Sequence, residues 1–175
     1  NSFSKSQFFS TTMATPYFLL IPYPVLGHVN PLIQLSQILV KHGCNITFLN
    51  TEFSHKRLNN NTGATGLDNL RRSGIKFVAL PDGLGLEDDR SDQKKVFLSI
   101  KTNMSSMLPK LIQDVNALDV SNKITCIVVT LSMTWALKVG NLGIKGALLW
   151  PASATSLALC NFMPRLIHDG VIDSS

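Results

Sequence analysis

The stretch "YFLLIPYPVLGHVNPLIQLSQILVKHGCNITFLN", residues 17–50, decides the fold. It opens on a continuous apolar run, which is typical of a strand buried on both faces of a sheet. An amphipathic run follows, in which Asn30 is placed to cap a helix, Pro31 to occupy its first position and Gly43 to end it. Residues 45–50 are apolar again, so the stretch predicts a strand–helix–strand unit.

The same alternation continues along the chain. Further strand-length apolar runs occupy residues 75–81, 124–130 and 146–150, and helical patterns occupy 54–59, 94–118, 132–143 and 153–167. A Gly/Asn-rich loop is expected over 59–66, and Pro109 is expected to kink or split the longest helix. Apolar strands that alternate with helices predict an α/β fold, a parallel sheet of buried strands with helices on both faces.

Composition narrows the class of protein. The chain has 175 residues, 45% of them hydrophobic and 15% charged, which fits one globular domain with a real core. The net charge is +5, but no basic stripe interleaved with aromatic residues appears, which argues against nucleic-acid binding. Cys44, Cys126 and Cys160 lie far apart, without the spacing of a metal site or a disulfide framework, so we expect no metal and a reducing, cytoplasmic location.

The two ends of the sequence carry their own expectations. Residues 1–12 are rich in Ser and Thr and lack acidic residues, so we interpret them as an upstream or disordered leader before a natural start at Met13. The apolar residues 17–26 are too few and too interrupted by proline for stable membrane insertion. Residues 168–175 lack a closing element, which suggests a truncated domain.

His28 is the candidate catalytic residue. In open α/β sheets ligands bind beyond the carboxyl ends of the strands, and His28 is expected in the loop after the first strand. The helix N-terminus that follows carries partial positive charge, which disfavours a protonated imidazole and leaves a neutral one to act as a general base. Gly27 allows close approach of backbone or substrate. A purely structural capping role for His28 remains the alternative.

Five segments together resemble the N-terminus of plant UDP-sugar-dependent glycosyltransferases that act on small molecules. They are residues 18–55, "PDGL" at 81–84, "ITCIVV…SMTWAL" within 124–137, "GIKGALLWPASATSLAL" at 143–159 and "LIHDGVID" at 166–173. The first segment is the most specific, because a strand, the pair Gly27-His28, the pair Asn30-Pro31 and a helix occur together in it.

The resemblance implies the N-terminal half of a GT-B fold, in which two Rossmann-like domains face each other across a cleft. Residues 13–175 then form the acceptor-binding domain, and the C-terminal domain that grips the UDP-sugar is missing from the sequence. The implied partner is a small hydroxylated acceptor, and this chain alone binds no donor. By the same resemblance, His28 deprotonates the acceptor hydroxyl for attack on the anomeric carbon of a sugar, glucose being the first choice.

The sequence departs from the family's pattern at the partner of the base. Where the family has an aspartate that hydrogen-bonds the catalytic histidine, this chain has Thr130, which can orient an imidazole but cannot balance its charge. Asp82, Asp88 and Asp89 lie in another loop, and we expect none of them to substitute.

Other residues carry weaker expectations. The resemblance places Trp150 and Ser153 near the sugar, whereas Pro151 stands where many relatives have threonine. An apolar acceptor pocket and ordinary core packing remain equally open for Trp135, Phe97, Met104 and Met107. We interpret His42 and His55 as surface residues and His168 as a helix C-terminal residue.

Other functions remain as alternatives. A non-catalytic domain that binds small molecules fits the missing donor domain and Thr130. A nicotinamide-binding domain would use Glu52 for a ribose, but the first turn has one glycine where that fingerprint needs three. A serine hydrolase is weaker still, because the sequence contains no G-x-S-x-G.

Overall fold

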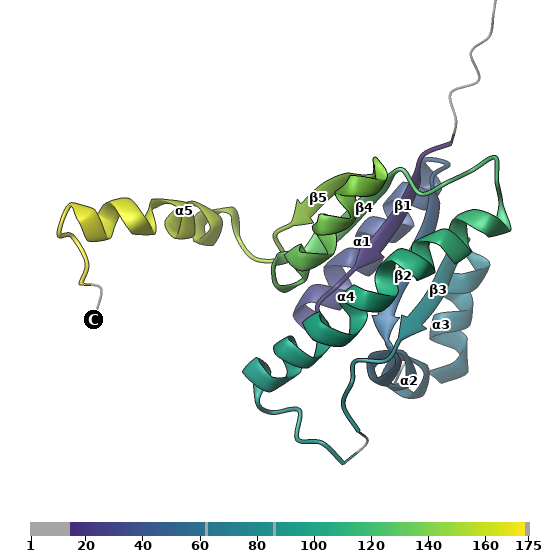
Figure 1. Ribbon diagram of the computed structural model, residues 1–175, viewed down its shortest axis with the longest axis horizontal. Helices are drawn as coiled ribbons and strands as arrows, with labels where there is room; N and C mark the ends of the chain where they lie inside the picture. Colours follow the sequence, from purple (N-terminus) through teal and green to yellow (C-terminus); the bar gives the residue numbers. More distant parts are fainter. Residues whose placement is uncertain (1–14, 62, 86, 174–175) are drawn as a thin grey trace, which may run out of the picture.

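The computed structural model describes residues 15–61, 63–85 and 87–173, and the predicted leader lies outside them. Five parallel strands form one sheet (Figure 1): β1 (Tyr17–Ile21), β2 (Asn45–Thr51), β3 (Ile75–Leu80), β4 (Cys126–Thr130) and β5 (Lys145–Leu149). Their order is β3-β2-β1-β4-β5, so the chain builds outward from β1 and then crosses back to β4. The reversal between β1 and β4 is where such sheets bind ligands.

Helices cover both faces of the sheet. They are α1 (Leu26–Lys41), α2 (Glu52–Asn61), α3 (Gly63–Arg72), α4 (Gln93–Leu118) and the 3₁₀ helix η1 (Leu131–Leu142), whereas α5 (Ala154–His168) projects away from it (Figure 1). Side chains of α1, α2 and α3 pack in one core cluster, and side chains of α4 and η1 pack in the other. The predicted fold class, α/β and Rossmann-like with helices on both faces of a parallel sheet, is confirmed.

Strand β1 shows why its sequence is a continuous apolar run. Successive side chains of a strand point to opposite faces of the sheet. Leu19 and Ile21 therefore join the core beneath α4, and Leu20 joins the core beneath α1. All three side chains are fully buried, so neither face of the central strand tolerates a polar residue.

Helix α1 begins about one turn earlier than predicted, and the prediction of Asn30 as its cap was wrong. The carbonyl of Val25 accepts the backbone N–H groups of His28 and Val29, at 2.9 and 3.0 Å, and this starts the helical hydrogen bonding. Pro31 lies inside the helix, where its missing N–H removes a single hydrogen bond. His28 therefore sits in the first turn of α1 and not in the preceding loop.

In the middle of the chain, the predicted loop and the predicted split of the longest helix were both wrong. The loop expected over 59–66 is largely helical, because α2 and α3 follow each other closely. Leu58 and Leu70 of these helices pack against the core, and such packing outweighs the poor helix propensity of Gly and Asn. Helix α4 is not split at Pro109, whose neighbour Leu108 is fully buried and helps hold the helix against the sheet.

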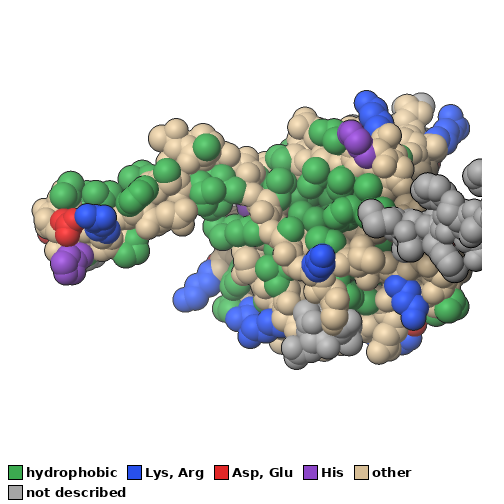
Figure 2. Space-filling model, turned by 90° about the horizontal axis from the view of Figure 1, so that it is seen from above, with side chains coloured by type: hydrophobic (Ala, Val, Ile, Leu, Met, Phe, Trp, Pro, Cys, Tyr) green, Lys and Arg blue, Asp and Glu red, His purple; other side chains and the backbone are tan. Residues whose placement is uncertain are grey.

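The edge strand β5 is exposed, so the prediction that it is buried was also wrong. A strand at the edge has only one strand neighbour, and α5 extends away from the sheet beyond it (Figure 1). Hydrophobic side chains gather along α5 and on the adjoining part of the main body (Figure 2), among them Leu148, Leu159 and Phe162. Within the described ranges, no helix combines the length and apolar character needed to cross a membrane.

Candidate active site

The sheet brings the predicted base and the position of its predicted partner to the same edge. Strands β1 and β4 are hydrogen-bonded neighbours, with Ile21 aligned to Val129. Thr130 is the last residue of β4, and His28 lies in the first turn of the helix that follows β1. Both residues therefore stand at the carboxyl ends of adjacent strands, at the reversal of strand order.

Tyr23, which sequence analysis did not single out, connects the two positions. Its backbone N–H donates a 2.8 Å hydrogen bond to the hydroxyl of Thr130. Its ring meets the His28 ring edge-on, with 5.8 Å between centroids and 67° between planes. Its own hydroxyl donates to the Gln93 side chain at 3.2 Å, which anchors the ring to the start of α4. The tyrosine lies 7% exposed, so these contacts are made away from bulk water.

The surroundings of His28 favour the neutral imidazole. The residue is half-buried, and burial lowers the pKa of the imidazole below its ordinary value. The partial positive charge of the α1 N-terminus acts in the same direction. Its Nδ1 atom is buried without a hydrogen-bond partner. A neutral ring with an unused nitrogen can accept a proton, and the buried Nδ1 is the atom to which an acidic partner would be added.

The hydroxyl of Thr130 hydrogen-bonds to the backbone of Tyr23 and not to His28. The residue is fully buried, and its hydroxyl accepts the Tyr23 N–H. No hydrogen bond joins Thr130 to His28 in the described part of the chain. The structure therefore gives this threonine a structural role and leaves the imidazole without a polar partner.

The three aspartates of the 81–92 loop that sequence analysis considered as substitutes are engaged elsewhere. Asp82 is 6% exposed and pairs with Arg90 at 3.2 Å. Asp88 pairs with Lys95, and Asp89 accepts two hydrogen bonds from Ser91. Each carboxylate already has its partners, which fits the expectation that none of them replaces the acid missing at the end of β4.

Gly27 and Asn30 lie on the exposed start of α1. A Cβ built on Gly27 would meet nothing within 4 Å, so the fold itself does not require glycine there. Asn30 is exposed and lines a cavity between α1 and α2. Their predicted closeness to acceptor or sugar stays a prediction.

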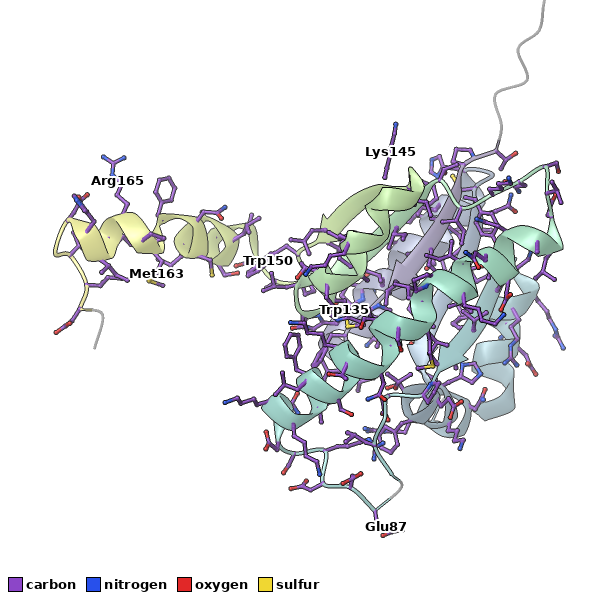
Figure 3. The ribbon with its side chains drawn as sticks, in the orientation of Figure 1. Glu87, Trp135, Lys145, Trp150, Met163 and Arg165 are labelled. Carbon is purple, nitrogen blue, oxygen red and sulfur yellow. The ribbon has the colours of Figure 1, made fainter. Side chains whose placement is uncertain are left out.

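Trp150 and Ser153 stabilise the start of α5. Ser153 is the N-cap of the helix, and its hydroxyl accepts the Ser156 N–H at 3.1 Å. The Trp150 indole N–H donates to the Ser153 carbonyl at 3.1 Å, and the ring stands at the root of the projecting helix (Figure 3). These contacts are local, so a role of either residue near a sugar stays a prediction.

Three of the four apolar residues considered for an acceptor pocket pack in the core. Trp135 and Met104 are 8% and 1% exposed, and Phe97 packs against the same cluster. Met107 is half-buried on the same helix as Phe97. None of the four lines either of the two cavities near the start of α1.

The predictions for the remaining histidines differ in outcome. His42 is exposed and His168 ends α5, as expected. His55 is half-buried, because its Nδ1 atom is enclosed while its Nε2 atom contacts Arg71 on the exposed side, so its interpretation as a surface residue holds only in part. Burial, and then the charge of the nearby Arg71, lower the pKa of its imidazole. Within the described ranges, no group of His, Cys, Asp and Glu has the arrangement of a metal site.

Two cavities open near the start of α1, although His28 lines neither, and sequence analysis missed most of the residues that shape them. A cavity of about 130 Å³ is lined by Tyr23, Asp82 and Arg90, among others, and one of about 380 Å³ lies between α1 and α2. Arg57 lines both. Arg57 could have been found from the helical pattern directly after the second strand, because that pattern places α2 at the ligand-binding edge of the sheet.

Comparisons with known proteins agree with this architecture. No protein-family model matches the chain. It is 33% identical over 168 residues to UDP-glycosyltransferase 83A1 of Arabidopsis thaliana, covering 93% of this chain and 36% of that protein. It is 38% identical over 156 residues to linamarin synthase 1 of Manihot esculenta, covering 87% and 31%. The chain thus spans about a third of the length of these relatives.

Solved structures show the same fold. A UDP-glucose:anthocyanidin 3-O-glucosyltransferase in complex with UDP superposes with a TM-score of 0.67 at 19% identity, over 91% of this chain and 35% of that one. A UDP-glucosyltransferase from Polygonum tinctorium that glucosylates indoxyl gives a TM-score of 0.64 at 23% identity, over 93% and 35%.

The fold class comes first: the Rossmann-like sheet of this chain has the fold of the N-terminal portion of GT-B glycosyltransferases. Within that class, the chain matches the N-terminal segment of the plant UDP-glycosyltransferases.

Proposed function

We propose that this chain supplies the acceptor site and the general base of an enzyme that transfers a sugar from a UDP-sugar to a small plant metabolite. The observation that carries the proposal is His28, held neutral by burial at the reversal of strand order, where the family resemblance expects the base. Names of relatives such as (R)-mandelonitrile beta-glucosyltransferase of Prunus dulcis favour glucose as the sugar. Three free cysteines favour the reducing cytoplasm as the location.

The proposed reaction needs one proton transfer from the acceptor. His28 takes the proton of the acceptor hydroxyl as its oxygen forms a bond to the anomeric carbon of the sugar. The bond from that carbon to UDP breaks, and UDP leaves with the electron pair. The protein must then stabilise an imidazolium in a half-buried position, which costs free energy in the absence of a nearby carboxylate. Because Thr130 provides no charge, we expect slow transfer.

The lack of a polar partner for the His28 imidazole among the described residues supports a second candidate function. Nδ1 of His28 is buried without a partner, and the threonine at the acid position is bonded to Tyr23. An imidazole that cannot be stabilised as a cation is a poor base. A domain that binds the acceptor without catalysing transfer is therefore the alternative.

The test is a chimera in which this chain replaces the matched N-terminal segment of UDP-glycosyltransferase 83A1. Release of UDP from UDP-glucose is measured with a panel of small hydroxylated acceptors. Release that depends on an acceptor supports the transferase. A chimera that binds acceptors but releases no UDP, beside an active unmodified relative, supports the non-catalytic alternative.

A further inference from the structure

We propose that the cavity between α1 and α2 binds a small apolar molecule that carries a carboxylate, and that Arg57 pairs with this carboxylate. The proposal goes beyond the transfer reaction, because it concerns binding alone and does not require His28 to act as a base. The site is built by the first turns of two helices that both begin at the carboxyl edge of the sheet.

The cavity has the size and lining of a small-molecule site. Its volume is about 380 Å³, within the range of ligand pockets. Its apolar wall consists of Pro24, Val25, Leu26, Val29 and Leu58. The polar side chains that reach it are few, Asn30, Ser54 and Arg57. Apolar walls with one charged group at the rim suit a ligand that has an apolar body and a single charge.

Arg57 and Arg90 lie near the same phenylalanine ring but differ in whether a carboxylate of the described residues neutralises them. Both guanidinium groups lie over the ring of Phe53, with their carbons 5.7 and 3.9 Å from its centre. Arg90 is neutralised by Asp82 at 3.2 Å and also donates to the Gly85 carbonyl at 2.9 Å. Arg57 forms no ion pair within the described part of the chain. Two guanidinium groups therefore lie near the Phe53 ring, and only that of Arg90 has a carboxylate partner among the described residues.

An anion in the cavity would balance the second cation. Asp82 lines the smaller cavity but not the larger one, so no carboxylate among the described residues lines the larger cavity. A guanidinium binds a carboxylate with two parallel hydrogen bonds, which makes arginine well suited to recognise it. The apolar wall offers few additional donors for a multiply charged phosphate, which is why the proposal names a carboxylate.

The experiment compares cinnamate with cinnamyl alcohol, which has the same apolar body without the charge. Their dissociation constants for this chain are measured by calorimetry, and the binding site is mapped by amide NMR shifts. We expect cinnamate to bind about tenfold more tightly, as one partly exposed charged hydrogen bond allows. The amide shifts should centre on Val25, Leu26 and Ser54. Added salt should weaken the binding of cinnamate but not that of cinnamyl alcohol.

Variants decide which cation is responsible. Arg57→Gln should remove the preference for cinnamate, and Arg57→Lys should retain part of it, because the charge stays while the planar fork is lost. Lys56→Gln is the matched control, since Lys56 is the adjacent exposed cation and lines neither cavity. Equal affinity for the two ligands, shifts centred elsewhere, or equal losses in Arg57→Gln and Lys56→Gln would each overturn the proposal. None of these outcomes depends on sugar transfer.

Discussion

The backbone N–H of Tyr23 donates a 2.8 Å hydrogen bond to the hydroxyl of Thr130, and this bond ties the segment leaving β1 to the end of β4. The ring of the same tyrosine contacts the imidazole of His28. One residue thus links the candidate base to the position where the family resemblance expects an acid. The threonine there holds the backbone in place and leaves the base without charge compensation.

Removing the hydroxyl of Thr130 should destabilise the fold. Thr130→Val leaves the Tyr23 N–H buried and unpaired, so we expect the free energy of unfolding to fall by about 1–3 kcal/mol. Urea denaturation measures the change. Thr134→Val, at an exposed position, is the control and should stay within about 0.5 kcal/mol. Equal effects of the two substitutions would show that the bond to Tyr23 has no special importance.

Adding an acid at the same position should improve catalysis. Thr130→Asp keeps an acceptor for the Tyr23 N–H and adds a charge that can stabilise the His28 imidazolium. We expect the transfer rate of the chimera to rise by up to about 10²–10⁴-fold. In this chain alone, NMR titration should show a higher His28 pKa. Thr130→Asn is the uncharged control, and an unchanged rate in Thr130→Asp would contradict our account of this position.

The stability of the fold should depend on pH through two histidines. Burial lowers the pKa of His28 and of His55 below 6.5 in the folded protein. Between the folded value and 6.5 the unfolded chain binds more protons, so stability is complete above about pH 6.5 and is lost as pH falls below it. Urea midpoints from pH 8 to pH 5 test this.

Substitution separates these two histidines from the rest. His28→Gln and His55→Gln should each flatten the decline in urea midpoint at acid pH, whereas His42→Gln, at an exposed position, should not. A wild-type protein whose midpoint rises as pH falls through this window would refute the predicted direction.

Tyr23 should control the environment of the imidazole. Tyr23→Leu removes the ring that packs edge-on against His28, so water gains access and the His28 pKa should rise toward its ordinary value. Tyr23→Phe keeps the ring and loses only the hydroxyl bonded to Gln93, so its His28 should titrate like the wild type. NMR titration distinguishes the two variants. Identical curves for both would mean that the ring does not shield the histidine.

The sequence alone was sufficient to predict the parallel sheet and the edge of it at which the candidate site lies. Continuous apolar runs such as residues 17–22 predict strands buried on both faces of a parallel sheet, although the edge strand β5, predicted in the same way, is exposed. The start of α1 was missed, because Asn30-Pro31 is a strong local signal while the actual start depends on the Val25 carbonyl. Local patterns also say nothing about contacts such as that between Tyr23 and Thr130, which are 107 residues apart in the chain.

The most direct test of the central claim is the acceptor-dependent transfer rate of the chimera with His28→Ala, beside His42→Ala. General-base catalysis contributes about 10²–10⁴-fold, so we predict a loss of that size for His28→Ala and a wild-type rate for His42→Ala. A chimera that transfers sugar equally well without the His28 imidazole would show that this residue is not the base.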